Sequence, residues 1–261
     1  MREENNIKNR VGEVRTMSCG EEAEIIEYNG VRDITVKFLK TRELVKSEYG
    51  QFLKGKVKSH FTPTAYGVGI IGLEKTKEKN GEAIKSYKTW NRMLERCYSK
   101  IYQQKRLTYK DCIVCDEWLY YPNFKKWYEE NFYEIEGQKT CLDKDILVKG
   151  NKIYSPDTCI FVPERINTLF TKRDANRGDL PIGVSWHKGG EKYETRCSIF
   201  EMGNNKTKKK YLGLHNTPEE AFNIYKQFKE KYIKQVADYY KDRIPSKLYD
   251  AMYSYKVHID D

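Results

Sequence analysis

The chain has 261 residues, a formal net charge of +10 at pH 7, and 39% hydrophobic residues, a content too high for a disordered chain. No apolar run approaches the ~20 residues that span a bilayer, and the first residues, Met-Arg-Glu-Glu-Asn-Asn, lack the apolar core of a signal peptide. We therefore expect a cytoplasmic protein with no membrane partner.

Charge and cysteine content indicate the partners and the compartment. The basic excess favours polyanions, nucleic acid first and an anionic membrane surface second, although a merely soluble Lys-rich protein carries the same charge. The seven cysteines are odd in number and do not resemble a disulfide framework, which fits a reducing cytosol. Cys112 and Cys115 have the spacing of half a structural Zn²⁺ site, and small buried thiols are the alternative for this pair.

Residues 1–75 carry three short apolar runs separated by glycine-containing turns. In the second run, Ile34, Val36 and Phe38 alternate with polar residues, the pattern of a half-buried strand. We predict a small β-barrel or rolled sheet of SH3-like size that serves as a scaffold or contact module. The three runs, and the expected strands, are 23–28, 34–39 and 68–73.

Residues 76–175 begin with a polar linker and continue with helical patterns. Five apolar residues fall at i, i+3, i+4, i+7 and i+8, which places them on one face of a helix, and a second helix is expected over Tyr121–Asn131. The pattern from Thr140 to Asn167 is shorter and irregular, and it favours a hairpin followed by a short helix. The residues of the first helical face are Trp90, Met93, Leu94, Cys97 and Tyr98.

Residues 176–240 show three alternating apolar segments and then a helix start. Thr217 fits a helix N-cap, with Pro218 at the first helical position and Glu220 three residues after the cap. The strands are expected around 182–186, 193–199 and 211–214.

Two stretches of this region carry a family resemblance. From Gly183 the chain reads G-V-S-W-H-K-G-G-E-K-Y-E-T-R-C, and further on it reads K-K-K-Y-L-G-L-H-N-T-P-E-E-A-F-N-I-Y. The opening Gly-Val, the aromatic-x-x-Arg strand at Tyr193 and Arg196, and the T-P-E-E-A helix start followed by Tyr225 resemble the AP2 family of DNA-binding domains. The resemblance implies a three-stranded sheet with one helix behind it, and double-stranded DNA bound by the open face of the sheet in the major groove.

The helix must cover one side of this sheet, which leaves the other side free. From Ile182 to His215 the chain has seven Lys or Arg against three Glu, a net charge of +4, so the free side can neutralise phosphates and present Arg196 to a guanine edge. On the covered side we place Ile182, Val184, Trp186, Tyr193, Thr195, Cys197 and Ile199. On the free side we place the expected DNA-binding residues Ser185, His187, Arg196, Ser198, Lys209 and Tyr211, beside Glu194 and Phe200. The family carries Arg and Trp where this chain has Ser185, His187, Ser198 and Tyr211, so phosphate contact is expected ahead of base readout.

The central segment has a second resemblance. It reads W-N-R-M-L-E-R-C-Y and later C-L-D-K-D-I-L-V-K-G-N-K-I-Y-S-P-D-T-C-I-F-V-P-E-R-I-N. These stretches resemble HNH-type proteins of bacteriophages, which often pair such a segment with an AP2 domain. In nucleases of this ββα-metal class a strand ends in Asp followed by a His general base, and an Asn or His on the next helix completes the metal site. The resemblance assigns Asp143 and Asn167 to a divalent cation, Mg²⁺ or Mn²⁺, and implies a bacterial host cell as the location.

The expected base is replaced in this chain. Lys144 follows Asp143, and all four histidines lie outside the central segment. Lys144 or Asp145 would have to activate water, a step to which a general base contributes ~10²–10⁴-fold. Acidic residues beside lysines in a turn are also commonly solvated ion pairs, which is the alternative for Asp143 and Asp145.

The leading hypothesis is a mixed α+β DNA endonuclease of phage or mobile-element type, in which the AP2-like sheet docks duplex DNA. The alternative is a non-catalytic DNA-binding regulator on a degenerate nuclease fold. A third hypothesis is a structural or host-interaction protein whose basic face binds RNA or an acidic partner. In the tail, 241–261, Tyr249, Met252 and Tyr255 at i, i+3 and i+6 suggest a docking helix.

Overall fold

The computed structural model describes residues 9–171, 179–203 and 206–259. The chain divides into two compact units, 1–130 with Lys152–Ser155 and 131–151 with 156–261. Helices and strands occur in both units, so the predicted α+β class is confirmed. In the described ranges no helix combines the length and the apolar character needed to cross a membrane.

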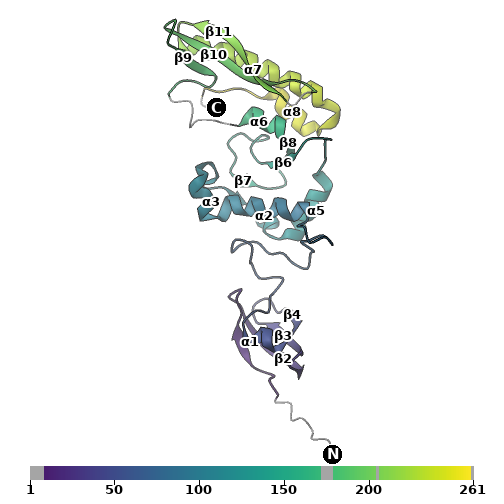
Figure 1. Ribbon diagram of the computed structural model, residues 1–261. Coiled ribbons are helices and arrows are strands. Elements are labelled where there is room, and N and C mark those ends of the chain that lie inside the picture. Colours follow the sequence, from purple (N-terminus) through teal and green to yellow (C-terminus); the bar gives the residue numbers. More distant parts are fainter. Residues whose placement is uncertain (1–8, 172–178, 204–205, 260–261) are drawn as a thin grey trace, which may run out of the picture. The chain divides into compact units, whose positions relative to one another are not determined.

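The first sheet is a four-stranded antiparallel meander in the order β1-β2-β3-β4 (Figure 1). Its alternating residues, such as Ile25 and Val36, point into a small core that Phe52 of α1 completes. The sheet stays open among the described residues, so the predicted closed barrel is wrong. The elements are β1 (Val14–Thr16), β2 (Glu22–Gly30), β3 (Asp33–Phe38), β4 (Leu44–Ser47) and α1 (Tyr49–Leu53).

The predicted strand at 68–73 is also wrong, since this stretch forms only isolated bridges. Gly67 and Gly72 adopt positive φ values of 76° and 68°, which interrupt an extended strand. The fourth strand of the sheet is instead β4, which pairs with β3.

The helical part of the first unit packs around aromatic side chains. The Trp90 indole donates a 2.7 Å hydrogen bond to the carbonyl of Trp118, and its ring lies 5.3 Å from that of Tyr121. The predicted face of the first helix is confirmed, because Trp90, Met93 and Leu94 are buried. The second helix covers the predicted residues. The elements are α2 (Lys85–Tyr98), α3 (Lys100–Lys105), η1 (Leu107–Tyr109), β5 (Ile113–Val114), α4 (Asp116–Leu119), α5 (Tyr121–Asn131) and β7 (Ile153–Tyr154), with β5 and β7 parallel.

The second unit begins with a hairpin and a helix, as predicted for 140–167. β6 (Thr140–Asp143) pairs antiparallel with β8 (Ile160–Pro163), and α6 (Glu164–Phe170) follows and packs on both strands. We call this arrangement the ββα element.

The second sheet has three antiparallel strands in the order β11-β10-β9, and α7 covers one side of it (Figure 1). The Thr217 hydroxyl accepts a hydrogen bond from the amide of Glu220 at 3.2 Å, so the predicted N-cap is confirmed. Gly183 stands directly before β9 and against the Tyr225 ring. A Cβ at this position would lie 2.1 Å from that ring, which is why a glycine is needed there. The elements are β9 (Val184–His187), β10 (Lys192–Phe200), β11 (Thr207–His215) and α7 (Pro218–Tyr240).

Two residues of this sheet depart from the predicted burial. Trp186 was expected beneath the helix but is 47% exposed, and its ring packs edge-on against Tyr193. Phe200 was expected on the free face but is buried. The Tyr232 hydroxyl accepts a hydrogen bond from the Phe200 backbone amide and donates one to its carbonyl, both at 2.8 Å. The end of β10 is thereby fastened to α7.

α7 contributes to two cores. Its first half, with Ala221 and Tyr225, packs on the sheet, while its second half, with Ile233 and Val236, packs on the ββα element. The predicted docking helix in the tail is confirmed as α8 (Ser246–Ser254), which follows η3 (Lys241–Arg243) and buries Met252 in the second core.

We expect Tyr232→Phe to destabilise the protein by about 1–3 kcal/mol, because it leaves buried polar groups of Phe200 without their partner. Urea unfolding measures this loss. Tyr239→Phe is the control, since Tyr239 is 40% exposed on the same helix, and it should change stability by less than about 0.5 kcal/mol. Equal effects of the two substitutions would contradict the fastening role of the Tyr232 hydroxyl.

Candidate nucleic-acid interface and acidic turn

The strand register gathers the six expected DNA-binding residues on one face of the second sheet. Glu194 lies opposite Ser185, Arg196 opposite Tyr211, and Ser198 opposite Lys209. Residues directly opposite each other in an antiparallel pair share a face, and His187 joins them through its partner Lys192. We call this surface, made of Ser185, His187, Arg196, Ser198, Lys209 and Tyr211, the open face.

The open face is accessible and cationic. Tyr211 is 52% exposed, and Ser185, Arg196, Ser198 and Lys209 are exposed as well. The Arg196 guanidinium donates to Glu194 at 2.7 Å, and its own side chain is 51% exposed. The Glu194 side chain is only 15% exposed, so Arg196 is the accessible member of this ion pair and the one that can reach a phosphate.

Asp143 ends β6 at the first turn of the ββα element. Its Oδ1 accepts hydrogen bonds from the amides of Asp145 at 2.9 Å and Ile146 at 2.8 Å. An aspartate that caps its own turn in this way fixes the direction of the following loop.

The Asp143 carboxyl is electrostatically perturbed. Burial raises its pKa to about 6, and the negative charge of the neighbouring Asp145 adds to this increase, while the two amide hydrogen bonds oppose it. Two carboxylates that disfavour each other's charge are an arrangement that a divalent cation relieves. Perturbed carboxyls of this kind are common at functional sites.

Lys144 is buried, and hydrogen bonds hold its ammonium group in place. Its Nζ donates to the carbonyl of Asn151 at 2.6 Å and to Oδ2 of Asp145 at 3.1 Å, and the Asn151 amide donates back to the Lys144 carbonyl at 2.7 Å. These bonds close the loop between β6 and the following segment. An ammonium that donates in this way has no lone pair to take a proton from water, so Lys144 is poorly suited to be the base.

Asn167 lies in α6, on the same ββα element as Asp143, and its backbone carbonyl accepts from the Thr171 hydroxyl at 3.2 Å. In 9–171, 179–203 and 206–259 no group of three or more His, Cys, Asp and Glu is arranged to hold a metal. Asp143 and Asn167 thus lie on one element, and a cation held by them stays a prediction.

The cysteine half-site offers little to zinc. The Cys112 thiol is buried and donates to the carbonyl of Thr108 at 3.9 Å. Burial raises the pKa of Cys115, which disfavours the thiolate that zinc requires.

One residue beside the open face was missed by the sequence reasoning. Lys229 lies in the apolar stripe of α7, four residues after Tyr225 and three before Tyr232, and is only 8% exposed. A cation at a stripe position is the sequence signal that identifies it.

Comparison of the chain with protein-family models, with curated proteins and with solved structures gave no match.

In NMR titration we expect the Asp143 carboxyl carbon to show a midpoint of about 6. Asp145→Asn should lower this midpoint without restoring the ordinary value, because burial is the larger cause. The pKa of Asp143 is higher in the folded state than in the unfolded state, so the folded state binds the proton more tightly. The free energy of unfolding should therefore rise as the pH falls from above 6 toward 4. This rise should vanish in Asp143→Asn. A midpoint near 4 would contradict the buried, carboxylate-facing environment.

Proposed function

We propose that the protein binds double-stranded DNA through the open face and cleaves it with a divalent cation held at the ββα element. The observation that carries the DNA-binding proposal is the gathering of cations on one exposed sheet face. Arg196 and Lys209 lie on adjacent strands of that face, and Lys192, opposite His187, adds a third exposed cation to it.

A cationic sheet face suits a duplex for two physical reasons. Lysines and arginines displace the counterions condensed on DNA, which gives affinity without dependence on sequence. The hydroxyls of Ser185, Ser198 and Tyr211 can donate to phosphate oxygens, as such side chains do in many protein–DNA contacts. Arg196 is the residue best suited to a guanine edge, once it exchanges Glu194 for the base.

The cleavage proposal is supported by the ββα element and by the raised pKa of Asp143. A cation held by Asp143 and Asn167 would polarise a phosphodiester and lower the pKa of a bound water. Asp145 is the base candidate, because it is half-exposed whereas the Lys144 ammonium is engaged by hydrogen bonds.

A second candidate function is a non-catalytic DNA-binding protein, for example a regulator. It is favoured by one observation, namely that Oδ1 of Asp143 already accepts two backbone amides as a turn cap. An ion must then compete for this carboxylate with the hydrogen bonds that shape the loop.

Duplex binding is tested by fluorescence anisotropy at several salt concentrations. We expect Lys209→Ala and Arg196→Ala each to weaken binding and to reduce the slope of log K against log salt by about 0.9, because each removes one phosphate contact. Lys247→Ala on α8 is the matched control, since Lys247 is exposed in the same unit but away from the sheet. Equal losses for all three variants would point to charge alone and sink the open-face proposal.

Cleavage is tested by plasmid nicking with Mg²⁺ or Mn²⁺. We expect wild-type protein to nick, Asp143→Ala to lose activity, and Asp157→Ala to retain it, since Asp157 is an exposed acidic residue elsewhere in the same loop. Plasmid that is shifted on a gel but never nicked by wild-type protein would select the non-catalytic function.

A further inference from the structure

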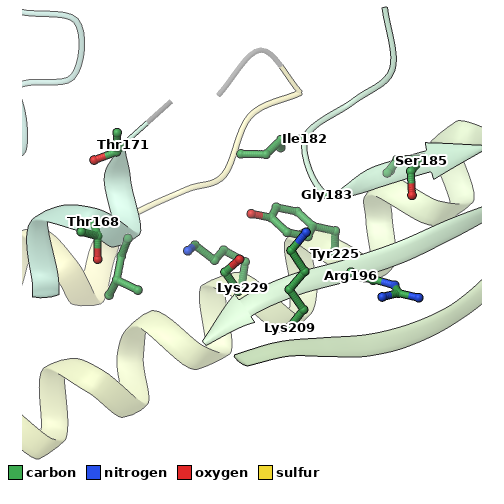
Figure 2. Close-up of a pocket in the computed structure, with 12 residues that line it drawn as sticks. Thr168, Thr171, Ile182, Gly183, Ser185, Arg196, Lys209, Tyr225 and Lys229 are labelled. Atoms are coloured by element: carbon green, nitrogen blue, oxygen red, sulfur yellow. The ribbon is translucent and has the colours of Figure 1, made fainter. Parts of the chain in front are cut away.

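A pocket of about 320 Å³ opens at the edge of the second sheet (Figure 2). β9 pairs with β10 only as far as Thr195, so no strand of the described residues lies beside the second half of β10 on that edge. Figure 2 shows the pocket between this edge, the chain entering β9 at Ile182 and Gly183, the end of α6, and α7 beneath. The pocket lies within the second compact unit.

The pocket wall combines positive charge with hydroxyl groups. Arg196, Lys209 and Lys229 line it, together with the hydroxyl-bearing Thr168 and Ser198. None of the twelve described residues that line the pocket is acidic. Ser185 and Thr171 add two further hydroxyls, so the wall offers donors that suit an anionic oxygen ligand beside the apolar Leu169, Ile182 and Val184.

Lys229 is the residue that distinguishes this pocket from an ordinary basic surface. Lys229 is 8% exposed, and among the described residues its ammonium forms no ion pair with a carboxylate. Burial lowers its pKa, and the nearby Cys197 thiol acts weakly in the opposite direction. Burying a cation without a counter-charge is costly, which an apolar residue at this stripe position would avoid.

We propose that this pocket is a phosphate-binding site, in which Lys229 provides the buried charge and Arg196 and Lys209 close over the anion from the open face. The cations and hydroxyls that line the pocket offer hydrogen-bond donors to a phosphate group, which would supply the counter-charge that Lys229 lacks. The source that the geometry favours is a phosphodiester of a bound duplex, because Arg196 and Lys209 also belong to the open face. This choice of source alone rests on the proposed DNA binding.

Inorganic phosphate is the first probe, with the thermal unfolding midpoint of the full chain as the readout at constant ionic strength. A ligand that binds the folded state raises this midpoint saturably. We expect Lys229→Met to weaken phosphate binding roughly 10- to 100-fold, the loss typical of a hydrogen bond to a charged group. Lys231→Met, an exposed lysine on the same helix, is the matched control and should bind as wild type does.

A second variant keeps the test informative if the buried substitution perturbs folding. Lys209→Met changes an exposed residue on the pocket rim and should weaken phosphate several-fold while leaving the unliganded midpoint unchanged. Phosphate stabilisation that is non-saturable, or equal in wild type and both pocket variants, is a general salt effect and overturns the proposal.

A short duplex is the second probe and separates the two sources of phosphate. Loss of both phosphate and duplex affinity in Lys229→Met assigns the pocket to a DNA phosphodiester. Loss of phosphate affinity with unchanged duplex affinity, or with no duplex binding by wild type, assigns it to a free phosphate-bearing ligand. The phosphate site and the DNA-binding proposal can thus fail independently.

Discussion

The apolar face of α7 is the constraint on which the second compact unit depends. A helix of 23 residues is about 35 Å long at 1.5 Å per residue, long enough to serve two cores. Tyr225 packs on the sheet near one end, and Ile233 and Val236 pack on the ββα element toward the other. Because one rigid helix supports both elements, the cationic open face and the acidic turn are parts of one body, and neither can shift without disturbing the packing of the other.

Phe200, the pocket and Lys229 all lie at the junction between these two cores, and stability alone does not account for them. Phe200 leaves the sheet face there and is held by Tyr232, and the pocket opens beside the unpaired edge of β10. Lys229 lies on α7 at this junction, where a well-packed apolar side chain would be the more stable choice. A buried charge facing a polar pocket is the arrangement expected where stability is traded for ligand binding.

Local patterns predicted the helical elements well. The stripe around Trp90 gave a helix whose face is buried, and the Thr217 cap started α7 where predicted, because both signals act within a few residues of chain. The sheets were predicted less well. The apolar run at 68–73 did not produce a strand, and Trp186 and Phe200 exchanged the expected burial, because a strand's neighbours and twist come from distant parts of the chain. The resemblances to AP2 and HNH-type proteins, with the site residues they imply, stay predictions.

The amino-acid sequence by itself determined the α+β class, the helix positions, the ββα order and the basic character of the last sheet, since each follows from local periodicity, capping and composition. Only the tertiary structure decided the register that sets Arg196 opposite Tyr211 and Ser198 opposite Lys209, the hydrogen bonds that hold Lys144 in a turn, and the place of Lys229 in a pocket wall. These facts depend on strand register and on which side chains are removed from water. Both are set by packing between segments far apart in the chain, which no local pattern encodes.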